Sequence, residues 1–295
     1  MYSLKRMDKQ YLEVSIPKWT ERAANEDAAS ASAGRLVVSD GAGGCGVFAG
    51  EWAQWLVSHL SPTVPITNFE QLDEWVDNLW EPFYNQYEQR AKAGDGMLLN
   101  KFYAEGSCAT VAAAWKGKAD AWTWMTYGDS VVFHYNLHTR RLEYSFSRLA
   151  DFSQPPHLVS CKDALDPVGF RSGTFHTAKG SVVFAASDAL AHYLLMMYAL
   201  SCPADFAREL SEERASGSAN AQLLRIAETM QFDFDHDVLR PLLRSAVSEA
   251  DFSAYLQSLW HKGILDVDDC TLVAAFDSEC FSLFDDSTIS SCNIQ

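Results

Sequence analysis

Hydrophobic residues change their spacing several times along the chain. They recur at helical spacing from residue 48 to 60 and again from 69 to 87, where Pro82 is expected to kink or split the helix. From 188 to 261 the spacing is helical again. Short runs rich in Val, Trp, Tyr and Phe predict strands at 35–38, 110–115, 120–126, 131–135, 142–146, 181–185 and 272–276.

The order of these elements limits the fold class. Two helices come early, most strands lie in the middle and further helices come late, unlike the regular strand–helix alternation that builds a parallel sheet. The 295 residues contain no internal repeat and no clear linker, and they suffice for one large domain or two small ones. The pattern therefore predicts an α+β protein in which helices cover antiparallel sheets.

Composition and charge narrow the range of partners. Hydrophobic residues make up 48% of the chain, which is typical of a globular protein. The formal net charge is -16. Nucleic-acid binding depends on Lys and Arg that neutralise phosphates, so we expect no nucleic-acid partner. An acidic chain also repels anionic membrane surfaces, and its excess negative charge could instead bind cations.

The cysteines and the apolar runs bear on localisation. Seven cysteines are scattered without a CxxC pair, so neither a disulfide framework nor a zinc knuckle is expected. The N-terminus lacks an apolar signal core. The longest apolar stretch, 189–200, is shorter than the roughly 20 residues that span a bilayer. These features predict a cytoplasmic protein with reduced thiols and no membrane association.

Several acidic residues lie at predicted strand ends or turns. They are Glu26 and Asp27, Asp40, Asp129, Asp188, and the pair Asp268 and Asp269. Carboxylates at strand ends can converge on one rim of a sheet, where they repel one another unless they are protonated or bound to cations. Oxygen ligands suit magnesium, manganese or calcium. The alternative is a set of solvated turn aspartates, because Asp is common in turns.

Two other motifs suggest different chemistry. Residues 41–46 match GxGxxG, the dinucleotide fingerprint, but Asp40 would oppose a bound pyrophosphate and no acid lies about 20 residues further on. Residues 233–237 contain a DxD pattern, as in aspartyl-phosphate phosphatases, but a helical pattern rather than an apolar strand precedes it. We expect that segment to be a solvated loop.

The acidic residues belong to an ordered series of motifs. In chain order these are Arg22-x-x-Asn25-Glu26-Asp27-Ala28, Val38-Ser39-Asp40-Gly41-x-Gly43-Gly44, Gly106-Ser107-Cys108-Ala109-Thr110, Tyr127-Gly128-Asp129-Ser130, Ala186-Ser187-Asp188 and Asp268-Asp269-Cys270-Thr271. From Arg22 to Phe276 the series resembles the type-2C, metal-dependent serine/threonine protein phosphatases, in particular their bacterial members. The resemblance implies a four-layer αββα sandwich, with two central antiparallel sheets flanked by helices.

The resemblance also implies domain boundaries and partners. The phosphatase-like domain would cover residues 1–276, with a helical insertion within about 190–262, and residues 277–295 would form an acidic, serine-rich extension. The substrate would be a phosphorylated protein, and a serine/threonine kinase or its targets would be the counterpart.

Roles for individual residues follow from the same resemblance. The metal ligands would be Asp40 bridging two manganese or magnesium ions, the Gly41 carbonyl, Asp188 and Asp268 at the first ion, Glu26 and Asp27 at the second, and Asp129 with Asp188 at a looser third site. Arg22 would hold phosphate oxygens with its planar guanidinium. Two ions can lower the pKa of a bridging water, and the resulting hydroxide would attack phosphorus directly without a covalent phosphoenzyme.

Three positions depart from the family pattern. Ala189 replaces the glycine usual after the Asp188 equivalent, Val131 replaces a frequent arginine, and Ala42 stands where other members carry histidine or methionine. A histidine general acid at position 42 is therefore not expected. Two alternatives stay open: a weak or inactive pseudophosphatase that acts as a binding module, and a phosphatase of a small phosphorylated metabolite.

Overall fold

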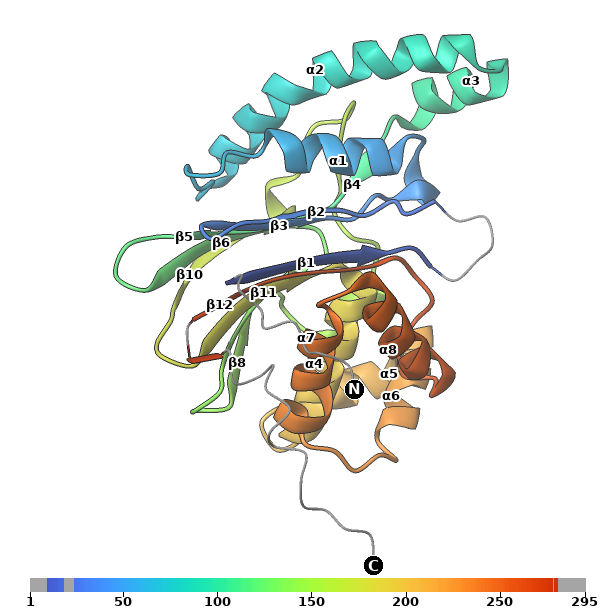
Figure 1. Cartoon of the computed structure of the whole chain (residues 1–295). Coiled ribbons are helices and arrows are strands. Elements are labelled where there is room, and N and C mark those ends of the chain that lie inside the picture. The colour runs from blue at the N-terminus through green and yellow to red at the C-terminus, as the bar shows by residue number, and fades with distance from the viewer. Residues whose placement is uncertain (1–9, 19–23, 278, 281–295) are drawn as a thin grey trace, which may run out of the picture.

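Two five-stranded antiparallel sheets lie face to face at the centre of the molecule (Figure 1). The computed structural model describes residues 10–18, 24–277 and 279–280. The first sheet contains, in spatial order, β1 (Tyr11–Ile16), β12 (Cys270–Phe276), β11 (Ser181–Ala186), β7 (Val131–Asn136) and β8 (Arg141–Tyr144). The second contains β10 (Phe170–His176), β6 (Ala121–Tyr127), β5 (Val111–Lys116), β3 (Arg35–Ser39) and β2 (Ala28–Ala31). A small third sheet pairs β4 (Cys108–Ala109) with β9 (Val159–Ser160).

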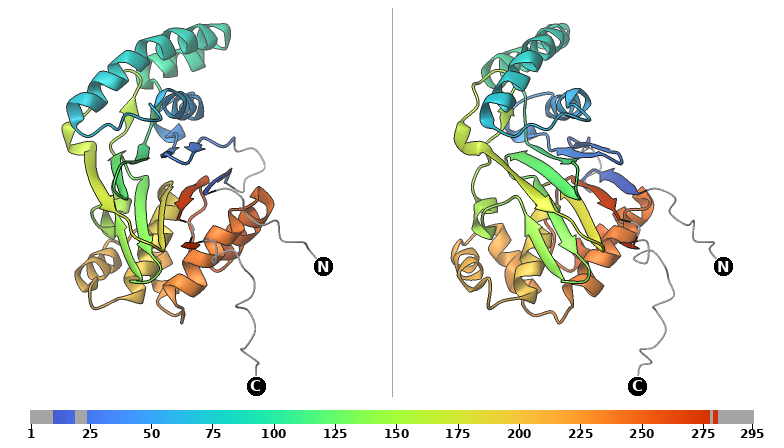
Figure 2. Two further views of the ribbon diagram at one scale, coloured as in Figure 1. Left: turned by 60° about the vertical axis from the view of Figure 1, so that its left-hand side comes forward. Right: turned by 90° about the vertical axis from the view of Figure 1, so that its left-hand side faces the viewer.

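Helices cover the outer face of each sheet (Figure 2). The second sheet is covered by α1 (Ala49–His59), α2 (Phe69–Ala93) and α3 (Gly96–Glu105). The first sheet is covered by α4 (Asp188–Ser201), α5 (Ala207–Ala215), α6 (Ala219–Ala227), α7 (Arg240–Ser245) and α8 (Glu249–His261). Short helical turns are η1 (Gly43–Cys45), η2 (Leu149–Ser153), η3 (Pro167–Gly169) and the π-helix η4 (Phe234–Leu239). The expected four-layer sandwich is confirmed.

The layers are held together by three hydrophobic clusters, one between each pair of adjacent layers. Side chains on the two faces of each central strand belong to different clusters, because successive side chains along a strand point to opposite faces. On β3, Leu36 and Val38 face the other sheet, whereas Val37 packs toward α1. Because both faces of β3 are buried, its sequence is a continuous apolar run rather than an alternation of apolar and polar residues.

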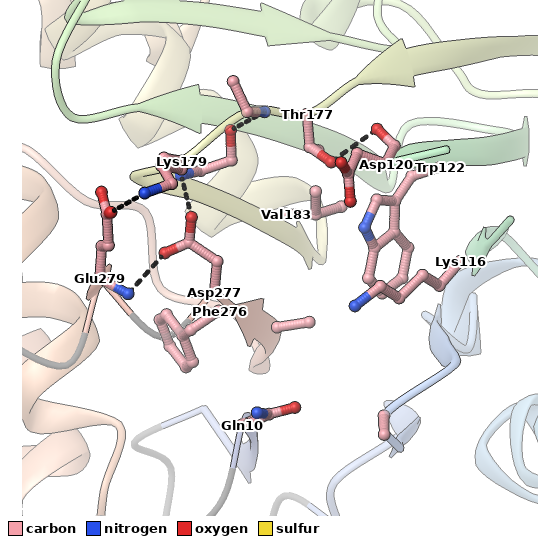
Figure 3. A pocket seen from close by; sticks show the side chains of 14 residues that line it. Gln10, Lys116, Asp120, Trp122, Thr177, Lys179, Val183, Phe276, Asp277 and Glu279 are labelled. Carbon is pink, nitrogen blue, oxygen red and sulfur yellow. Dashed lines mark hydrogen bonds and ion pairs between the residues drawn. The ribbon is translucent and has the colours of Figure 1, made fainter. Parts of the chain in front are cut away.

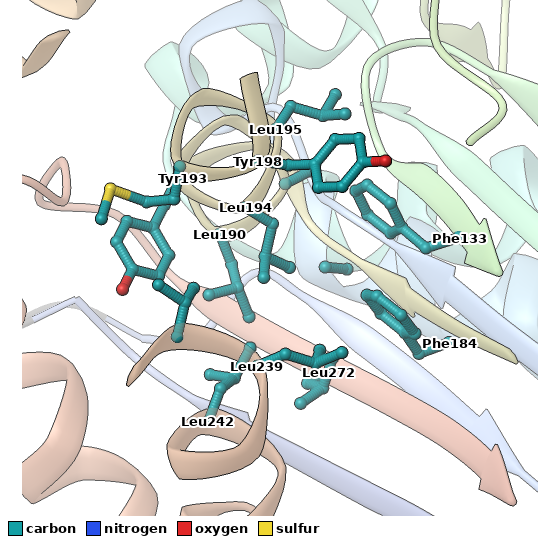
Figure 4. Packing of buried hydrophobic residues seen from close by; sticks show 14 of the residues in the cluster. Phe133, Phe184, Leu190, Tyr193, Leu194, Leu195, Tyr198, Leu239, Leu242 and Leu272 are labelled. Carbon is teal, nitrogen blue, oxygen red and sulfur yellow. The ribbon is translucent and has the colours of Figure 1, made fainter. Parts of the chain in front are cut away.

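Helix α4 lies at the centre of the largest cluster. All of its residues from Ala189 to Ala199 are buried, because the sheet lies on one side and the outer helices on the other. Figure 4 shows Leu190 and Leu194 of α4 beside Phe133 and Phe184, whose rings stack with centroids 4.8 Å apart. Throughout the described ranges, no helix combines the length and the apolar character that a membrane span requires.

The structure differs from the sequence-based expectations at several elements. Three strands at or near sheet edges, β1, β2 and β10, were not predicted, although alternation of the buried residues Leu12, Val14 and Ile16 does signal β1. Helix α2 runs through Pro82 without a break, so the predicted split is wrong. Pro82 has no amide hydrogen to donate to the carbonyl one helical turn before it. Because Pro82 lies on the exposed side of α2, that carbonyl can bond to water instead.

Candidate active site

The predicted carboxylates come from loops at one end of the sandwich. Strands β3 and β11 end there, and β12 and β7, the antiparallel neighbours of β11, begin there: Ala186 of β11 lies opposite Leu272 of β12 and Val131 of β7. Asp40 follows β3 and Asp188 follows β11, whereas Asp129 and Asp268 precede β7 and β12. The antiparallel pairing of β11 with β7 and β12 brings Asp129, Asp188 and Asp268 to one end of the first sheet, and the stacking of the two sheets adds Asp40.

A cavity of about 230 Å³ lies among these loops. The residues that line it are Lys18, Glu26, Asp40, Gly41, Ala42, Gly43, Gly44, Thr110, Asp129, Pro156, Leu158, Asp188, Asp268 and Asp269. Six of the predicted site residues, Glu26, Asp40, Gly41, Asp129, Asp188 and Asp268, are thus in one place. Arg22 lies outside the described residues.

Asp27 is not on the cavity wall, but its carboxylate belongs to the same cluster. Its charge raises the pKa of Asp40, and the charge of Asp188 raises that of Asp27. Both carboxylate oxygens are buried and make no hydrogen bond within the described part of the chain. The hydroxyls of Thr271 and Ser187 lie near enough to lower its pKa, and they also contact the Ser15 hydroxyl and the Asp269 carbonyl.

Burial and mutual repulsion dominate the electrostatics of the cluster. Burial, together with the charge of Asp188, raises the pKa of Asp27 and of Asp129 to about 7. Burial and the charge of Asp268 raise the pKa of Asp188 to about 6. The pKa of Asp40 lies well above its ordinary value because the group is buried beside Asp27, Asp188 and Asp129. A cation would relieve this repulsion.

The donor set fits divalent cations, although it is not arranged as a finished coordination shell. Across residues 10–18, 24–277 and 279–280, no three His, Cys, Asp or Glu side chains already stand in metal-ligand geometry. The carboxylates nevertheless line one cavity, and the charges of Asp27, Asp188 and Asp129 raise the pKa of Asp40. Buried carboxylate oxygens without donors, as in Asp27, are the ligands that hard cations prefer. Metal binding would require the side chains to turn toward shared ions.

Glycines let the loop after Asp40 approach the acidic segment closely. A Cβ on Gly41 would lie 2.6 Å from the Glu26 carbonyl oxygen, and one on Gly43 would overlap the Glu26 carboxylate. The Gly41 amide donates to that same Glu26 carbonyl at 3.1 Å. Gly41 therefore has a packing reason, the close approach of two backbone segments, whereas at Gly43 only the flexible end of the Glu26 side chain is near.

Thr110 joins two of the aspartate loops. Its hydroxyl accepts a hydrogen bond from the Asp40 amide at 3.1 Å and bonds the Ser130 hydroxyl at 2.7 Å. Gly128, in the same turn as Asp129, has φ of 105°, and a Cβ there would lie 2.7 Å from a Thr110 methyl carbon. The turn therefore needs glycine at this position.

Asp269 has a structural role that sequence reasoning missed. It is 4% exposed, and its two carboxylate oxygens accept hydrogen bonds from the Lys18 and Glu26 amides, both at 2.7 Å. It thereby fixes both flanks of the segment that contains Arg22. Both residues of the Asp268–Asp269 pair line the cavity, and nothing local in the sequence shows that Asp269 is the one that binds the two amides.

Lys18 is a second site residue that the sequence did not reveal. Its ammonium nitrogen lies 3.4 Å from Asp268 Oδ1 and 3.9 Å from Glu26 Oε2. A positive charge of the protein itself therefore contacts two of the predicted metal ligands. No local signal marks this residue, because the contacts span up to 250 positions.

A smaller cavity of about 70 Å³ adjoins the site at the start of α4, and His192 lines it with Asp188, Asp266 and Asp268. His192 Nε2 lies 3.6 Å from Glu213 Oε1, and both side chains are at least 95% buried. Neither Nε2 nor either Glu213 oxygen makes a hydrogen bond within the described residues. The pair therefore forms a polar contact inside the otherwise apolar layer around α4.

The three positions that depart from the family pattern have different surroundings. Val131 is fully buried in the hydrophobic cluster beneath the first sheet, and Ala189 is buried in the first turn of α4. Ala42 lines the cavity and carries no group that could transfer a proton.

A second cavity, of about 240 Å³, lies at the opposite end of the sandwich (Figure 3). Residues that line it include Gln10, Lys116, Trp122, Lys179, Asp277 and Glu279. Here Asp277 and Glu279 have partners: Asp277 Oδ2 accepts from the Gly180 amide at 2.6 Å and the Ser181 amide at 3.3 Å. Lys179 pairs with Glu279 at 3.1 Å.

No protein-family model matches the chain. No curated protein matches it either. Among solved structures it is similar to the Mycobacterium tuberculosis serine/threonine phosphatase PstP/Ppp, with a TM-score of 0.49 and 16% identity over 90% of this chain and 98% of that one. The catalytic domain of PstP in complex with two manganese ions gives a TM-score of 0.49 and 17% identity, with 90% and 98% covered.

The serine/threonine phosphatase Stp1 from Staphylococcus aureus gives a TM-score of 0.47 and 14% identity, with 94% of this chain and 98% of that one covered. These similarities concern the fold.

Proposed function

We propose that this chain is a metal-dependent phosphatase that hydrolyses phosphoserine and phosphothreonine in proteins, as its resemblance to the type-2C phosphatases implies. The observation that carries the proposal is the convergence of buried, mutually repelling carboxylates in one cavity. Such a cluster costs stability unless cations or protons neutralise it, so a protein that retains it has a use for the cations.

The residues that would hold two ions are Asp40, the Gly41 carbonyl, Asp188, Asp268, Glu26 and Asp27, and Asp129 with Asp188 would hold a weaker third ion. Two manganese or magnesium ions would supply a water activated at neutral pH and would offset charge on the phosphoryl oxygens. No serine, cysteine or histidine nucleophile is needed, which agrees with a cavity wall that contains none.

The protein's own part is to orient the phosphate and to fix the ligands. Arg22 would bind phosphate oxygens in two-point fashion. Its segment is anchored on both sides, because Lys18 and Glu26 donate their amides to Asp269. The hydrogen bonds of Thr110 hold the Asp40 and Asp129 loops at a fixed separation. Pre-set ligand loops lower the reorganisation that metal and substrate binding would otherwise require.

The proposed substrates are phosphoproteins, with a serine/threonine kinase as the enzyme that forms them. A cytoplasmic location belongs to the same proposal. Its support is that Cys45, Cys108, Cys161, Cys202, Cys270 and Cys280 form no disulfide in the structure.

Hydrolysis of p-nitrophenyl phosphate by the purified chain tests the proposal, first with Mn²⁺ and then with excess chelator. We expect turnover that requires metal and is abolished by chelator and by Asp40→Asn. Asp277→Asn, at the opposite end of the sandwich, is the matched control and should keep its activity. Turnover in chelator, or an unaffected Asp40→Asn variant, would contradict the proposal. Phosphopeptides and phosphorylated metabolites, compared at equal concentration, then identify the substrate class.

A further inference from the structure

Lys18 is held in place by its backbone, not by its charge. It lies two residues beyond the end of β1, and its amide donates to Asp269 Oδ1 at 2.7 Å. Asp269 is itself 4% exposed and also binds the Glu26 amide. The position of the Lys18 backbone is therefore fixed relative to Glu26, and only the side chain is free to change its contacts.

The ammonium group of Lys18 contacts two carboxylates that are assigned to different ions. Its distances are 3.4 Å to Asp268 Oδ1, a predicted ligand of the first ion, and 3.9 Å to Glu26 Oε2, a predicted ligand of the second. The Lys18 side chain is 31% exposed, so water screens this contact only in part.

We propose that Lys18 is a tethered counter-ion that competes with divalent cations for Glu26 and Asp268, and so sets how tightly the cavity binds metal. The inference rests on the proposed function in that it takes these carboxylates as metal ligands. An ammonium and a divalent ion cannot share the same carboxylate oxygens without strong like-charge repulsion. Metal binding therefore requires the Lys18 side chain to withdraw along its flexible four-carbon stem.

Two consequences follow from one positive charge at this position. In the metal-free protein Lys18 offsets part of the repulsion among the carboxylates and so stabilises the fold. In the metal-bound protein the same charge lies close to the ions and weakens their binding. Removing it should therefore shift stability and metal affinity in opposite directions, which a lysine with a merely structural role would not do.

The test compares wild type with Lys18→Met, which keeps a stem of similar length without the charge. Mn²⁺ binding to the chelator-treated full chain is measured by titration calorimetry. We expect Lys18→Met to bind Mn²⁺ about tenfold more tightly, because one like charge a few ångströms from the ion is gone. The metal-free variant should melt below wild type, and Mn²⁺ should remove that difference. Lys18→Arg keeps the charge and should bind Mn²⁺ much as wild type does.

Lys116→Met is the matched control, since Lys116 lines the cavity at the opposite end of the sandwich. It should change neither Mn²⁺ affinity nor the metal dependence of melting. If Lys18→Met does not fold, Lys18→Gln provides a polar variant of the same charge change. Equal or weaker Mn²⁺ binding by the charge-removing variants overturns the inference.

The outcome separates this inference from the proposed function. Tighter Mn²⁺ binding by Lys18→Met without phosphatase turnover in either protein would support the counter-ion and overturn the phosphatase. Turnover that depends on Mn²⁺, with equal Mn²⁺ affinities of wild type and Lys18→Met, would support the phosphatase and overturn the counter-ion. If neither protein binds Mn²⁺, both proposals are overturned.

Discussion

Carboxylates gather at both ends of the β-sandwich, but they have different partners. At the end where β3 and β11 finish, the buried oxygens of the Asp27 carboxylate accept no hydrogen bond from a backbone amide within the described residues, and burial raises its pKa to about 7. At the other end, Asp277 accepts hydrogen bonds from four backbone amides between 2.6 and 3.3 Å away. There, hydrogen bonds from Lys179 and His138 lower the pKa of Glu279.

This difference in hydrogen-bond partners distinguishes carboxylates that stabilise a loop from carboxylates that are available to a ligand. A carboxylate whose lone pairs are filled by amides stabilises its loop and has little left to offer a cation. A buried carboxylate without donors destabilises the protein until a cation or a proton arrives. Structural and ligand-binding carboxylates can be neighbours in sequence: Asp269 accepts hydrogen bonds from two amides, whereas Asp268 beside it is a predicted metal ligand.

The largest effect is expected from Asp40→Asn. It removes the charge at the centre of the cluster, so we expect phosphatase turnover with Mn²⁺ to fall by about a thousandfold, as a loss of several kcal/mol of charge stabilisation implies. Because repulsion with Asp27, Asp188 and Asp129 is relieved, the metal-free variant should be at least as stable as wild type. Steady-state kinetics and urea unfolding measure the two effects. A variant that loses activity and also unfolds more easily would argue against a repulsive cluster.

Asp277→Asn should behave in the opposite way. It weakens hydrogen bonds to the Gly180, Ser181, Glu279 and Cys280 amides, so we expect the free energy of unfolding to fall by about 1–2 kcal/mol. Activity of the folded protein should not change, because the residue lies at the far end of the sandwich. The urea midpoint and the rate with Mn²⁺ are the measurements. A loss of activity at full stability would contradict the contrast between the ends.

The pH dependence of stability should follow the raised pKa values. Asp27 and Asp129, at about 7, and Asp188, at about 6, bind protons in the folded state that the unfolded state has already lost above about 4. Their stabilising contribution is therefore complete below about pH 4 and is lost as pH rises through 6 to 7. Melting of the chelated protein at about pH 5 and about pH 7.5 checks this. Mn²⁺ should restore stability at the higher pH, and a chelated protein that gains stability across this range would refute the cluster's electrostatics.

The smallest effect is expected from Glu279→Gln. This residue pairs with Lys179 and His138 through an exposed side chain, and surface ion pairs of this kind contribute little. Melting temperature, Mn²⁺ affinity and turnover should all equal those of wild type within error. A clear change in Mn²⁺ affinity would mean that the two ends of the sandwich are electrostatically coupled.

Much of the fold follows from local pattern. Periodicity placed most of the central strands, α1 and the apolar helix α4, because alternation and helical spacing reflect which faces are buried. It missed β10, where Arg171, Gly173 and other polar or small residues form an edge strand with little apolar alternation. The sequence also suggested that the helix would split at Pro82, but Pro82 is exposed and α2 continues through it.

The sequence by itself determined that acidic residues follow or precede strands, and the ordered motifs suggested which of them act together. Only the tertiary structure decided that, of two neighbouring aspartates on the cavity wall, Asp269 binds the Lys18 and Glu26 amides while Asp268 contacts the Lys18 ammonium. The reason is physical: burial, hydrogen-bond partners and charge proximity arise between residues more than 200 positions apart, where local spacing holds no information.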